Sequence, residues 1–222
     1  HIVCVSKTVL GDVKQHLNPP SDKLHLIYNP SAPPHCDELM NEDASHKWIE
    51  NKPGLLLLSI GRLLPVKDFP TLFKAFKQLR TQKPEAKLIV LGEGTERPKL
   101  EHLINELDLS EHISMPGSAP NVFPFLKAAD LFVLSSTHEA LGNVLVEAIA
   151  CGTSVVSTDC GGPREILNDG ELGQLAPVSD PEALTSDILK ALEEPVDAEK
   201  LIARSRDFSG AAAAEAYLKL ID

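Results

Sequence analysis

Two glutamates, Glu139 and Glu147, lie eight positions apart in the stretch SSTHEALGNVLVEAIACGT, on either side of a small-residue turn. The apolar run 129–134 before the turn predicts a strand, and open α/β sheets bind ligands at the carboxyl ends of their strands. Gly142 and Asn143 can begin a helix whose first backbone N–H groups are free to bind an anion. A carboxylate just over one turn into that helix can accept hydrogen bonds from sugar hydroxyls while the amides hold phosphate. The layout therefore predicts a nucleotide-sugar site.

A basic pair supplies the positive charge that a diphosphate would need. Arg62 and Lys67 follow the apolar stretch 55–60, and Gly61 lets the chain turn so that both can face the same crevice. Arginine can make a bidentate contact and lysine a point-charge contact, which together would neutralise a leaving diphosphate. The sequence has no Asp-x-Asp pair of the kind that holds Mn or Mg against a diphosphate, so no metal is predicted. The alternative is that Arg62 and Lys67 only solvate a surface loop.

The elements that must position these side chains follow from the hydrophobic pattern. Short apolar runs alternate with amphipathic segments, which is typical of a parallel sheet wrapped by helices. Strands are predicted at 55–60, 87–91, 113–115, 131–134, 155–158 and 173–175. Helices are predicted at 69–82, 97–107, 122–128, 144–150, 164–167 and 181–193, the last with Asp180 as its N-cap, and from about 197 to 222.

Further short motifs extend the pattern. Besides the two glutamates, the chain has S-I-G-R at 59–62 followed by K-D at 67–68, L-G-E-G at 91–94, P-G at 116–117 and G-G-P-R-E at 161–165. In this order and spacing they resemble the C-terminal, donor-binding domain of the retaining GT-B glycosyltransferases of family 4, glycosyl transferases group 1, whose signature is E-x7-E. The resemblance implies an α/β fold with a Rossmann-like, doubly wound parallel sheet, the C-terminal half of a GT-B enzyme.

The same resemblance implies a domain organisation. Residues 1–50 would be a remnant of the N-terminal domain with the interdomain linker, 51–205 the nucleotide-sugar-binding domain, and 206–222 a helix that crosses back to the N-terminal domain. The chain is then expected to be a fragment. Residues 1–5 would form an edge strand without its sheet, so residues 1 to about 50 are expected to be displaced or packed irregularly. Residues 31–53 are polar and without periodicity, which indicates a linker.

Roles for individual residues come from the resemblance. It implies that Glu139 contacts the donor sugar, that Glu147 binds the ribose hydroxyls, and that Glu139, Arg62 and Lys67 are the catalytic residues. Ala140, where relatives often have glycine, could narrow the space beside the sugar. The implied donor-binding residues are Gly61, Gly92, Gly94, Gly117, Ser118, Ala140, Leu141, Gly142, Asn143, Val144 and Glu147.

Several of these residues also have simpler interpretations. Glu147 could be an ordinary helix-surface carboxylate, although its apolar neighbours favour a partner. Gly161, Gly162 and Glu165 could be turn glycines with a helix-capping glutamate. His138 is expected to shape the turn, because the departing phosphate in the family is thought to take the acceptor proton. The glycine loop at 92–94 is by itself weak evidence for a nucleotide site, because short Gly-x-Gly turns follow many strands. Arg97 stands where a dinucleotide-binding loop would have its third glycine, which argues against a hydride-transfer enzyme.

Composition narrows the class of protein. The chain has 222 residues, 43% of them hydrophobic, and a net charge of -11, which fits a soluble globular domain and argues against nucleic-acid binding. Its four cysteines have no C-x-x-C spacing, so free thiols in a reducing compartment are predicted. The expected location is the cytoplasm or the inner face of the cytoplasmic membrane.

The resemblance, together with the absence of an Asp-x-Asp pair, implies a retaining, metal-independent glycosyltransferase without a cofactor. It would transfer a hexose or N-acetylhexosamine from a UDP-sugar or a GDP-sugar to a glycan or lipid-linked acceptor, which the missing N-terminal domain would bind. The isolated chain is expected to bind donor and not turn it over, and the full-length enzyme to associate peripherally with a membrane. The alternatives are a sugar-nucleotide epimerase or phosphorylase of the same architecture, or a non-catalytic nucleotide-sugar-binding module.

Overall fold

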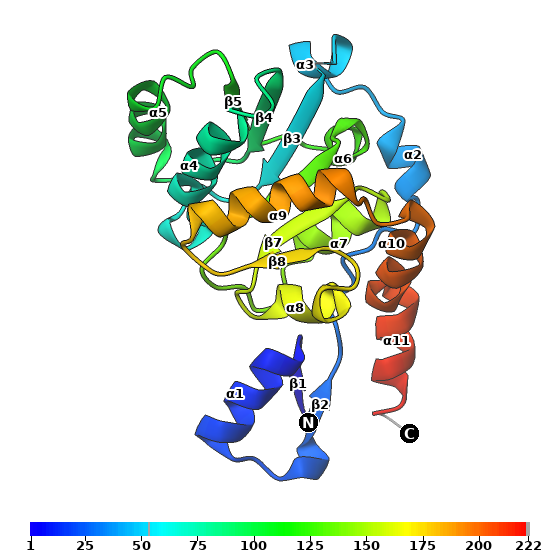
Figure 1. The fold of residues 1–222 in the computed structure, drawn as a ribbon. Helices are drawn as coiled ribbons and strands as arrows, with labels where there is room; N and C mark the ends of the chain where they lie inside the picture. The colour runs from blue at the N-terminus through cyan, green and yellow to red at the C-terminus, as the bar shows by residue number, and fades with distance from the viewer. Residues whose placement is uncertain (53, 221–222) are drawn as a thin grey trace.

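The structure is a computed structural model that describes residues 1–52 and 54–220. At its centre a six-stranded parallel sheet has the order β5-β4-β3-β6-β7-β8 (Figure 1). If the strands are numbered from the first strand of this sheet, the order is 3-2-1-4-5-6, that of the doubly wound nucleotide-binding fold. From β3 the chain first adds strands on one side and then, from β6, on the other, so the switch point lies between β3 and β6. The predicted fold class is confirmed. The strands are β3 (Leu55–Ile60), β4 (Ala86–Leu91), β5 (Ile113–Gly117), β6 (Leu131–Leu134), β7 (Val155–Thr158) and β8 (Gln174–Ala176).

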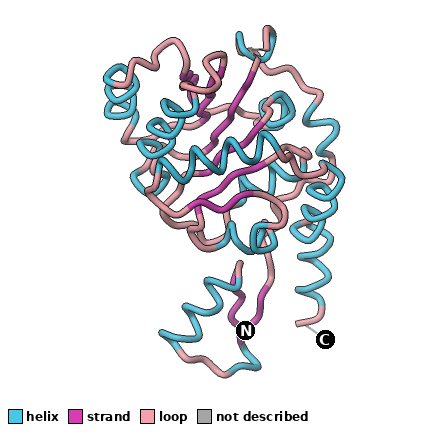
Figure 2. Tube along the Cα trace, in the orientation of Figure 1, coloured by secondary structure: helices cyan, strands magenta, loops and turns pink. Residues whose placement is uncertain are grey.

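Helices cover both faces of this sheet, as Figures 1 and 2 show. On one face lie α4 (Phe69–Leu79), α5 (Arg97–Glu106) and α9 (Pro181–Glu193), and on the other α6 (Phe123–Ala128), α7 (Asn143–Ala150) and α10 (Ala198–Ser205). Because successive strand side chains point to opposite faces, Leu57 packs with the α4 cluster and Leu58 with the α7 cluster. A strand buried on both sides needs apolar residues at every position, which explains the run of four leucines in β3.

The predicted boundaries agree closely with the structure in the strands and less closely in the helices. β3, β6, β7 and α9 have the predicted ranges, and the Asp180 side chain caps α9 by accepting from the Ala183 N–H at 2.9 Å. α4 ends at Leu79, three residues earlier than predicted, because Lys83 and the residues before it form the turn into β4. The helical turn predicted at 164–167 is α8 (Gly162–Ile166).

The N-terminal unit, β1 (Ile2–Cys4), α1 (Lys7–Leu17) and β2 (Leu24–Leu26), lies apart from the main sheet in Figure 1. The expectation of displacement or irregular packing covered residues 1 to about 50, and the structure differs from it in two ways: this unit has regular strand pairing, and Cys36 and Trp48 further along pack into the main core. β1 has a partner within the same segment, since it pairs in parallel with β2 from Ile2 opposite Leu24 to Cys4 opposite Leu26. The three-residue strand β2, which completes this β-α-β unit, is too short to show a periodic pattern in the sequence.

The expected linker contains two short helices, α2 (Cys36–Met40) and α3 (Lys47–Glu50), and buries Trp48. Helices of four or five residues are too short to show a periodic pattern, which explains why they were not predicted. At the other end of the chain, the single helix predicted at 206–222 is instead a 3-10 turn (Arg206–Phe208) followed by α11 (Gly210–Leu218), because Ser209 between them is extended and caps α11. The parts of the predicted linker and terminal helix at 53 and 221–222 lie outside the described residues.

The four cysteines are free, as predicted, but two of them are neighbours. The sulfur atoms of Cys36 and Cys151 are 3.7 Å apart, which brings the linker against the end of α7. Burial raises the pKa of both thiols. Within the described part of the chain, no helix has the length and apolar content that a membrane span requires.

Candidate functional site

The candidate site lies at the switch point of the sheet, where the chain leaves β3 and β6. The loops after these two strands are joined by hydrogen bonds: the Thr137 N–H donates to the Val66 carbonyl at 2.8 Å, and the Ser135 hydroxyl donates to the Lys67 carbonyl at 2.8 Å. Open α/β sheets bind ligands at such a point. The two groups of residues singled out from the sequence, around 62–67 and 139–147, are therefore held side by side.

Lys67 and Glu139 form an ion pair between these loops. The Lys67 Nζ is 2.5 Å from the Glu139 Oε1, and the two side chains are only 18% and 13% exposed. The Ser136 hydroxyl donates to the same carboxylate oxygen at 2.7 Å. Sequence reasoning placed Lys67 toward a diphosphate and Glu139 toward a sugar, and did not foresee that they pair directly. A ligand would therefore meet a preformed pair with little freedom to reorient.

The backbone of Glu139 is fixed as firmly as its side chain. Glu139 forms a parallel β-bridge with Gly161: its N–H donates to the Cys160 carbonyl and its carbonyl accepts from the Gly162 N–H, both at 3.0 Å. A Cβ at Gly162 would lie 2.3 Å from the Cα of Leu141, so the close approach requires glycine. The two glycines of the G-G-P-R-E motif thus support the loop that carries Glu139.

The N-terminus of α7 faces this loop without a side-chain cap. Gly142 is its N-cap residue, and no side chain in the described chain accepts a hydrogen bond there. The Asn143 side chain is exposed and accepts from the Asn29 side chain at 3.2 Å, while Leu141 is buried and offers a ligand only its backbone. Uncapped first-turn amides at a helix N-terminus attract an anion.

Glu147 lies on the next turn of α7 and is mostly buried. Burial alone raises its pKa to about 7, with no cation or hydrogen-bond donor of the described chain offsetting it. An ordinary helix-surface carboxylate would keep its solvent, so the simpler interpretation of Glu147 does not fit its environment. Sequence reasoning anticipated a partner because of the apolar neighbours, and no protein group in the described chain takes that place.

Two glycines bring the loop after β4 against the loop after β3. Gly92 has a φ of +142°, and a Cβ there would lie 1.9 Å from the Gly61 carbonyl oxygen. A Cβ at Gly94 would lie 2.4 Å from the Leu63 carbonyl oxygen. Gly92 also donates its N–H to the Gly117 carbonyl at 2.9 Å. Of the five glycines predicted as donor-binding, Gly92 thus contacts both Gly61 and Gly117, and Gly94 packs against the same loop after β3, so that four of the five lie in one wall of the site.

Gly92→Ala is therefore expected to lower the free energy of unfolding by at least about 2 kcal/mol, because both the backbone conformation and the space exclude a methyl group. Urea unfolding monitored by circular dichroism measures the change. Gly11→Ala is the control, since a Cβ at Gly11 meets nothing within 4 Å and lies inside helix α1. It should leave stability unchanged or slightly higher. Equal stability of the two variants would contradict this prediction.

A pocket of about 450 Å³ adjoins this wall. It is lined by Gly61, Arg62, Gly92, Glu93 and Ser118 among others. Arg62 is exposed, and its guanidinium has no hydrogen-bond or ion-pair partner in the described part of the chain. The sequence predicted all of these except Glu93 as site residues, and the structure brings them to the same pocket.

Arg97 is a residue whose structural role the sequence analysis missed. Its guanidinium binds the Glu93 carboxylate at 2.8 and 2.6 Å and the carbonyls of Gly92 and Met115 at 3.3 and 3.1 Å. These bonds tie the glycine loop to β5, and the bond from Arg97 holds the pKa of Glu93 below its usual range. The sequence signal for this role is the i,i+4 spacing of Glu93 and Arg97 at the start of a helix.

Comparison with known proteins gives the family. A family model described as glycosyl transferases group 1 matches residues 40–208. The lipopolysaccharide core biosynthesis glycosyltransferase LpsE of Rhizobium meliloti is 36% identical over 171 residues, which is 75% of this chain and 49% of that protein. The Campylobacter jejuni N-acetylgalactosamine-N,N'-diacetylbacillosaminyl-diphospho-undecaprenol 4-alpha-N-acetylgalactosaminyltransferase is 31% identical over 190 residues, 85% of this chain and 50% of that protein. The chain thus spans about half the length of these curated relatives.

Solved structures share the fold at lower sequence identity. A glycosyltransferase from Rickettsia africae superimposes with a TM-score of 0.85 at 19% identity, covering 98% of this chain and 62% of that one. The pneumococcal O-GlcNAc transferase GtfA, solved in complex with UDP and GlcNAc, superimposes with a TM-score of 0.78 at 18% identity, covering 99% of this chain and 44% of that one. At this level of identity the likeness establishes the architecture.

Proposed function

This chain belongs to the glycosyl transferases group 1 family, and we propose that it forms the donor-binding part of a retaining glycosyltransferase that uses a nucleotide-diphospho-sugar, with a UDP-sugar as the donor. The observation that carries the proposal is the Lys67–Glu139 pair beside the uncapped N-terminus of α7. Together they offer a cation, a carboxylate and free backbone amides within one crevice. A diphosphate attached to a sugar needs these three kinds of group.

Each part of the donor has a place in this proposal. The diphosphate lies at the first amides of α7, with Lys67 and Arg62 supplying positive charge. The sugar hydroxyls lie against Glu139 and the ribose hydroxyls against Glu147, which gives its otherwise solvent-deprived carboxylate hydrogen-bond donors. The base occupies the pocket beside Gly92 and Ser118 and is contacted mainly by backbone.

The proposed reaction follows from these placements. The bond between the sugar C1 and the diphosphate oxygen breaks, and a bond from an acceptor hydroxyl oxygen to C1 forms on the same face. The acceptor proton passes to the departing phosphate, so no side chain must act as a base. Lys67 and Arg62 stabilise the charge that develops on the diphosphate, and the proposal assigns this work to them instead of a metal.

The choice of donor and acceptor rests on the relatives. Structural neighbours from Anabaena and pneumococcus were solved with UDP, and the Campylobacter relative is named for transferring N-acetylgalactosamine to a diphospho-undecaprenol-linked sugar. We infer transfer of a hexose or N-acetylhexosamine to a glycan or lipid-linked acceptor by the whole protein. A lipid-linked acceptor would bring that protein to the cytoplasmic face of a membrane.

Calorimetric titration with UDP, GDP and ADP, followed by UDP-GlcNAc and UDP-glucose, tests the proposal. UDP is expected to bind more tightly than GDP or ADP, and Glu147→Ala to weaken UDP by about tenfold or more through the lost hydrogen bonds to a charged acceptor. Glu193→Ala, at an exposed carboxyl in α9, is the matched control and should bind UDP as the unmodified protein does. A folded protein that binds none of the nucleotides at millimolar concentration would refute the donor-site assignment.

A further inference from the structure

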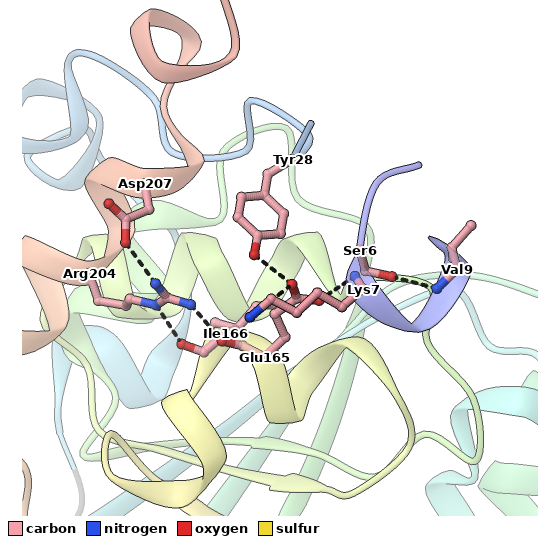
Figure 3. Close-up of polar contacts among 8 residues, drawn as sticks. All are labelled: Ser6, Lys7, Val9, Tyr28, Glu165, Ile166, Arg204 and Asp207. Atoms are coloured by element: carbon pink, nitrogen blue, oxygen red, sulfur yellow. Dashed lines mark hydrogen bonds and ion pairs between the residues drawn. The ribbon is translucent and has the colours of Figure 1, made fainter. Parts of the chain in front are cut away.

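Glu165, in α8, has a carboxylate that is only 6% exposed and lies outside the donor site described above. Both of its oxygens accept hydrogen bonds from the N-terminal segment. The Oε2 accepts from the backbone N–H of Lys7 at 2.8 Å, and the Oε1 accepts from the hydroxyl of Tyr28 at 2.5 Å (Figure 3). These bonds join parts of the chain that are 158 and 137 residues apart.

The bond to Lys7 caps helix α1 from outside the helix. The first amides of a helix have no partner within it, and carboxylates are favoured there by the helix dipole. In α1 the Ser6 hydroxyl accepts from the Val9 N–H at 3.1 Å, and Glu165 accepts from the Lys7 N–H, so two of these amides are satisfied (Figure 3). Glu165 is thus a helix-capping glutamate, but the helix it caps belongs to the N-terminal unit.

Glu165 also contacts the Tyr28 hydroxyl and the Lys7 ammonium, and these two contacts differ in strength. The Tyr28 hydroxyl is partly buried, and burial together with the bond to Glu165 raises its pKa, so it remains a protonated donor. The Lys7 ammonium is 4.0 Å from the carboxylate and its side chain is 75% exposed. An exposed ion pair at that distance contributes little. Glu165 therefore recognises the Lys7 amide and the Tyr28 hydroxyl far more than the Lys7 charge.

The helix that carries Glu165 is itself held at both ends. At its C-terminal end, the Arg204 guanidinium donates to the carbonyls of Glu165 at 2.6 Å and Ile166 at 3.0 Å, and also pairs with Asp207 at 2.7 Å (Figure 3). At its N-terminal end, the Gly162 N–H donates to the Glu139 carbonyl at 3.0 Å. This five-residue helix is therefore tied by hydrogen bonds to the Glu139 loop at one end and to Arg204 at the other.

We propose that Glu165 is a positioning residue that couples the placement of the N-terminal unit to the conformation of the Glu139 loop. The coupling rests on the proposed function, because Glu139 is assigned to the donor sugar there. A ligand that fixes Glu139 then also steadies α8 and, through Glu165, the start of α1. Thermodynamic linkage makes this effect reciprocal. If donor binding favours the docked N-terminal unit by a given factor, then displacing that unit weakens donor affinity by the same factor.

Amide hydrogen exchange resolved by NMR on the 222-residue protein tests this coupling without any ligand. In Glu165→Ala the Lys7 amide should exchange about tenfold faster or more, since it loses a charged acceptor. The Gly162 amide should also exchange several-fold faster, whereas the Leu88 amide in β4 should not change. Glu165→Gln keeps one acceptor oxygen and should restore part of the protection. Lys7→Ala, which leaves the amide in place, should behave as the unmodified protein after correction for intrinsic rates.

A second arm adds UDP-GlcNAc. The ligand should slow exchange at Lys7 in the unmodified protein and have no such effect in Glu165→Ala. Unchanged Lys7 or Gly162 exchange in Glu165→Ala, or equal ligand protection in both proteins, would overturn the proposal. If no nucleotide binds, the proposed function fails, while the ligand-free arm still decides whether Glu165 holds the N-terminal unit to the Glu139 loop. Tyr28→Phe removes one of the two hydrogen bonds to the Glu165 carboxylate, and it replaces Glu165→Ala in the exchange experiment if that variant does not fold.

Discussion

Glu147→Gln should raise the free energy of unfolding of the ligand-free protein by up to about 3 kcal/mol at pH 8 and by almost nothing at pH 4. Burial raises the pKa of Glu147 from 4.5 to about 7. Below pH 4.5 the carboxyl is protonated in the folded and unfolded states alike, so it costs nothing. Between pH 4.5 and 7 the Glu147 carboxyl ionises in the unfolded state but stays largely protonated in the folded state, so the free energy of unfolding falls as the pH rises. Glutamine is neutral throughout and avoids this loss.

Urea unfolding of both proteins at pH 4 and pH 8 measures the difference, and comparing the variant with its parent cancels the other titrating groups. Glu193→Gln, at an exposed carboxyl in α9, should give the same difference at both pH values. A gain for Glu147→Gln that is equal at the two pH values would show that Glu147 is not desolvated. Glu147→Gln is also expected to weaken UDP binding. The protein would then keep a carboxylate that destabilises its fold because the carboxylate is needed to bind the nucleotide.

Lys67→Met should weaken UDP at least about tenfold and also destabilise the fold, whereas Arg62→Ala should weaken UDP alone. The difference follows from their surroundings. Lys67 neutralises the mostly buried Glu139 carboxylate, so its removal leaves a charge without its cation. Arg62 is exposed and has no partner in the described part of the chain, so its removal leaves nothing unpaired.

A double-mutant cycle separates the two roles of Lys67. Combining Lys67→Met with Glu139→Gln should recover stability, with a coupling energy of about 1–3 kcal/mol in urea unfolding. The double variant should nevertheless bind UDP no better than Lys67→Met, because the cation is still missing. Additive effects on stability would contradict the ion pair, and restored UDP binding would contradict the role of Lys67 at the diphosphate.

The main sheet was predictable from the sequence because its strands are buried on both faces. A strand such as β3, with leucine at four successive positions, has few other stable environments, and the glycine or proline turns around it set its limits. The N-terminal unit and the helices of the linker were harder. β2 has three residues, none fully buried, so its sequence carries no alternation that distinguishes it from a loop.

Within the site, the sequence predicted which residues gather but not how they bond to one another. Strand order places Arg62, Lys67, Glu139 and Glu147 at one switch point, and the doubly wound fold that has this order was implied by the family resemblance. The Lys67–Glu139 bond, the Arg97 clamp on the glycine loop and the Glu165 cap depend on side-chain directions across loops. Spacing along the chain carries no information about those directions, so only the three-dimensional structure reveals them.

The isolated bridge between Glu139 and Gly161 means that the loop after β6 meets the loop after β7 once more beyond the end of the ladder, where Leu134 pairs with Ser157. Its length is therefore constrained at both ends, by the ladder at Leu134 and by the bridge at Glu139. One extra residue between β6 and Glu139 would have to be absorbed between the ladder and the bridge, and would displace the Glu139 carboxylate from Lys67 unless the loop bulged. The exposed connection between α9 and α10 has no such pairing. Among natural variants of this protein, insertions and deletions should accumulate in that connection and be absent from residues 135–142.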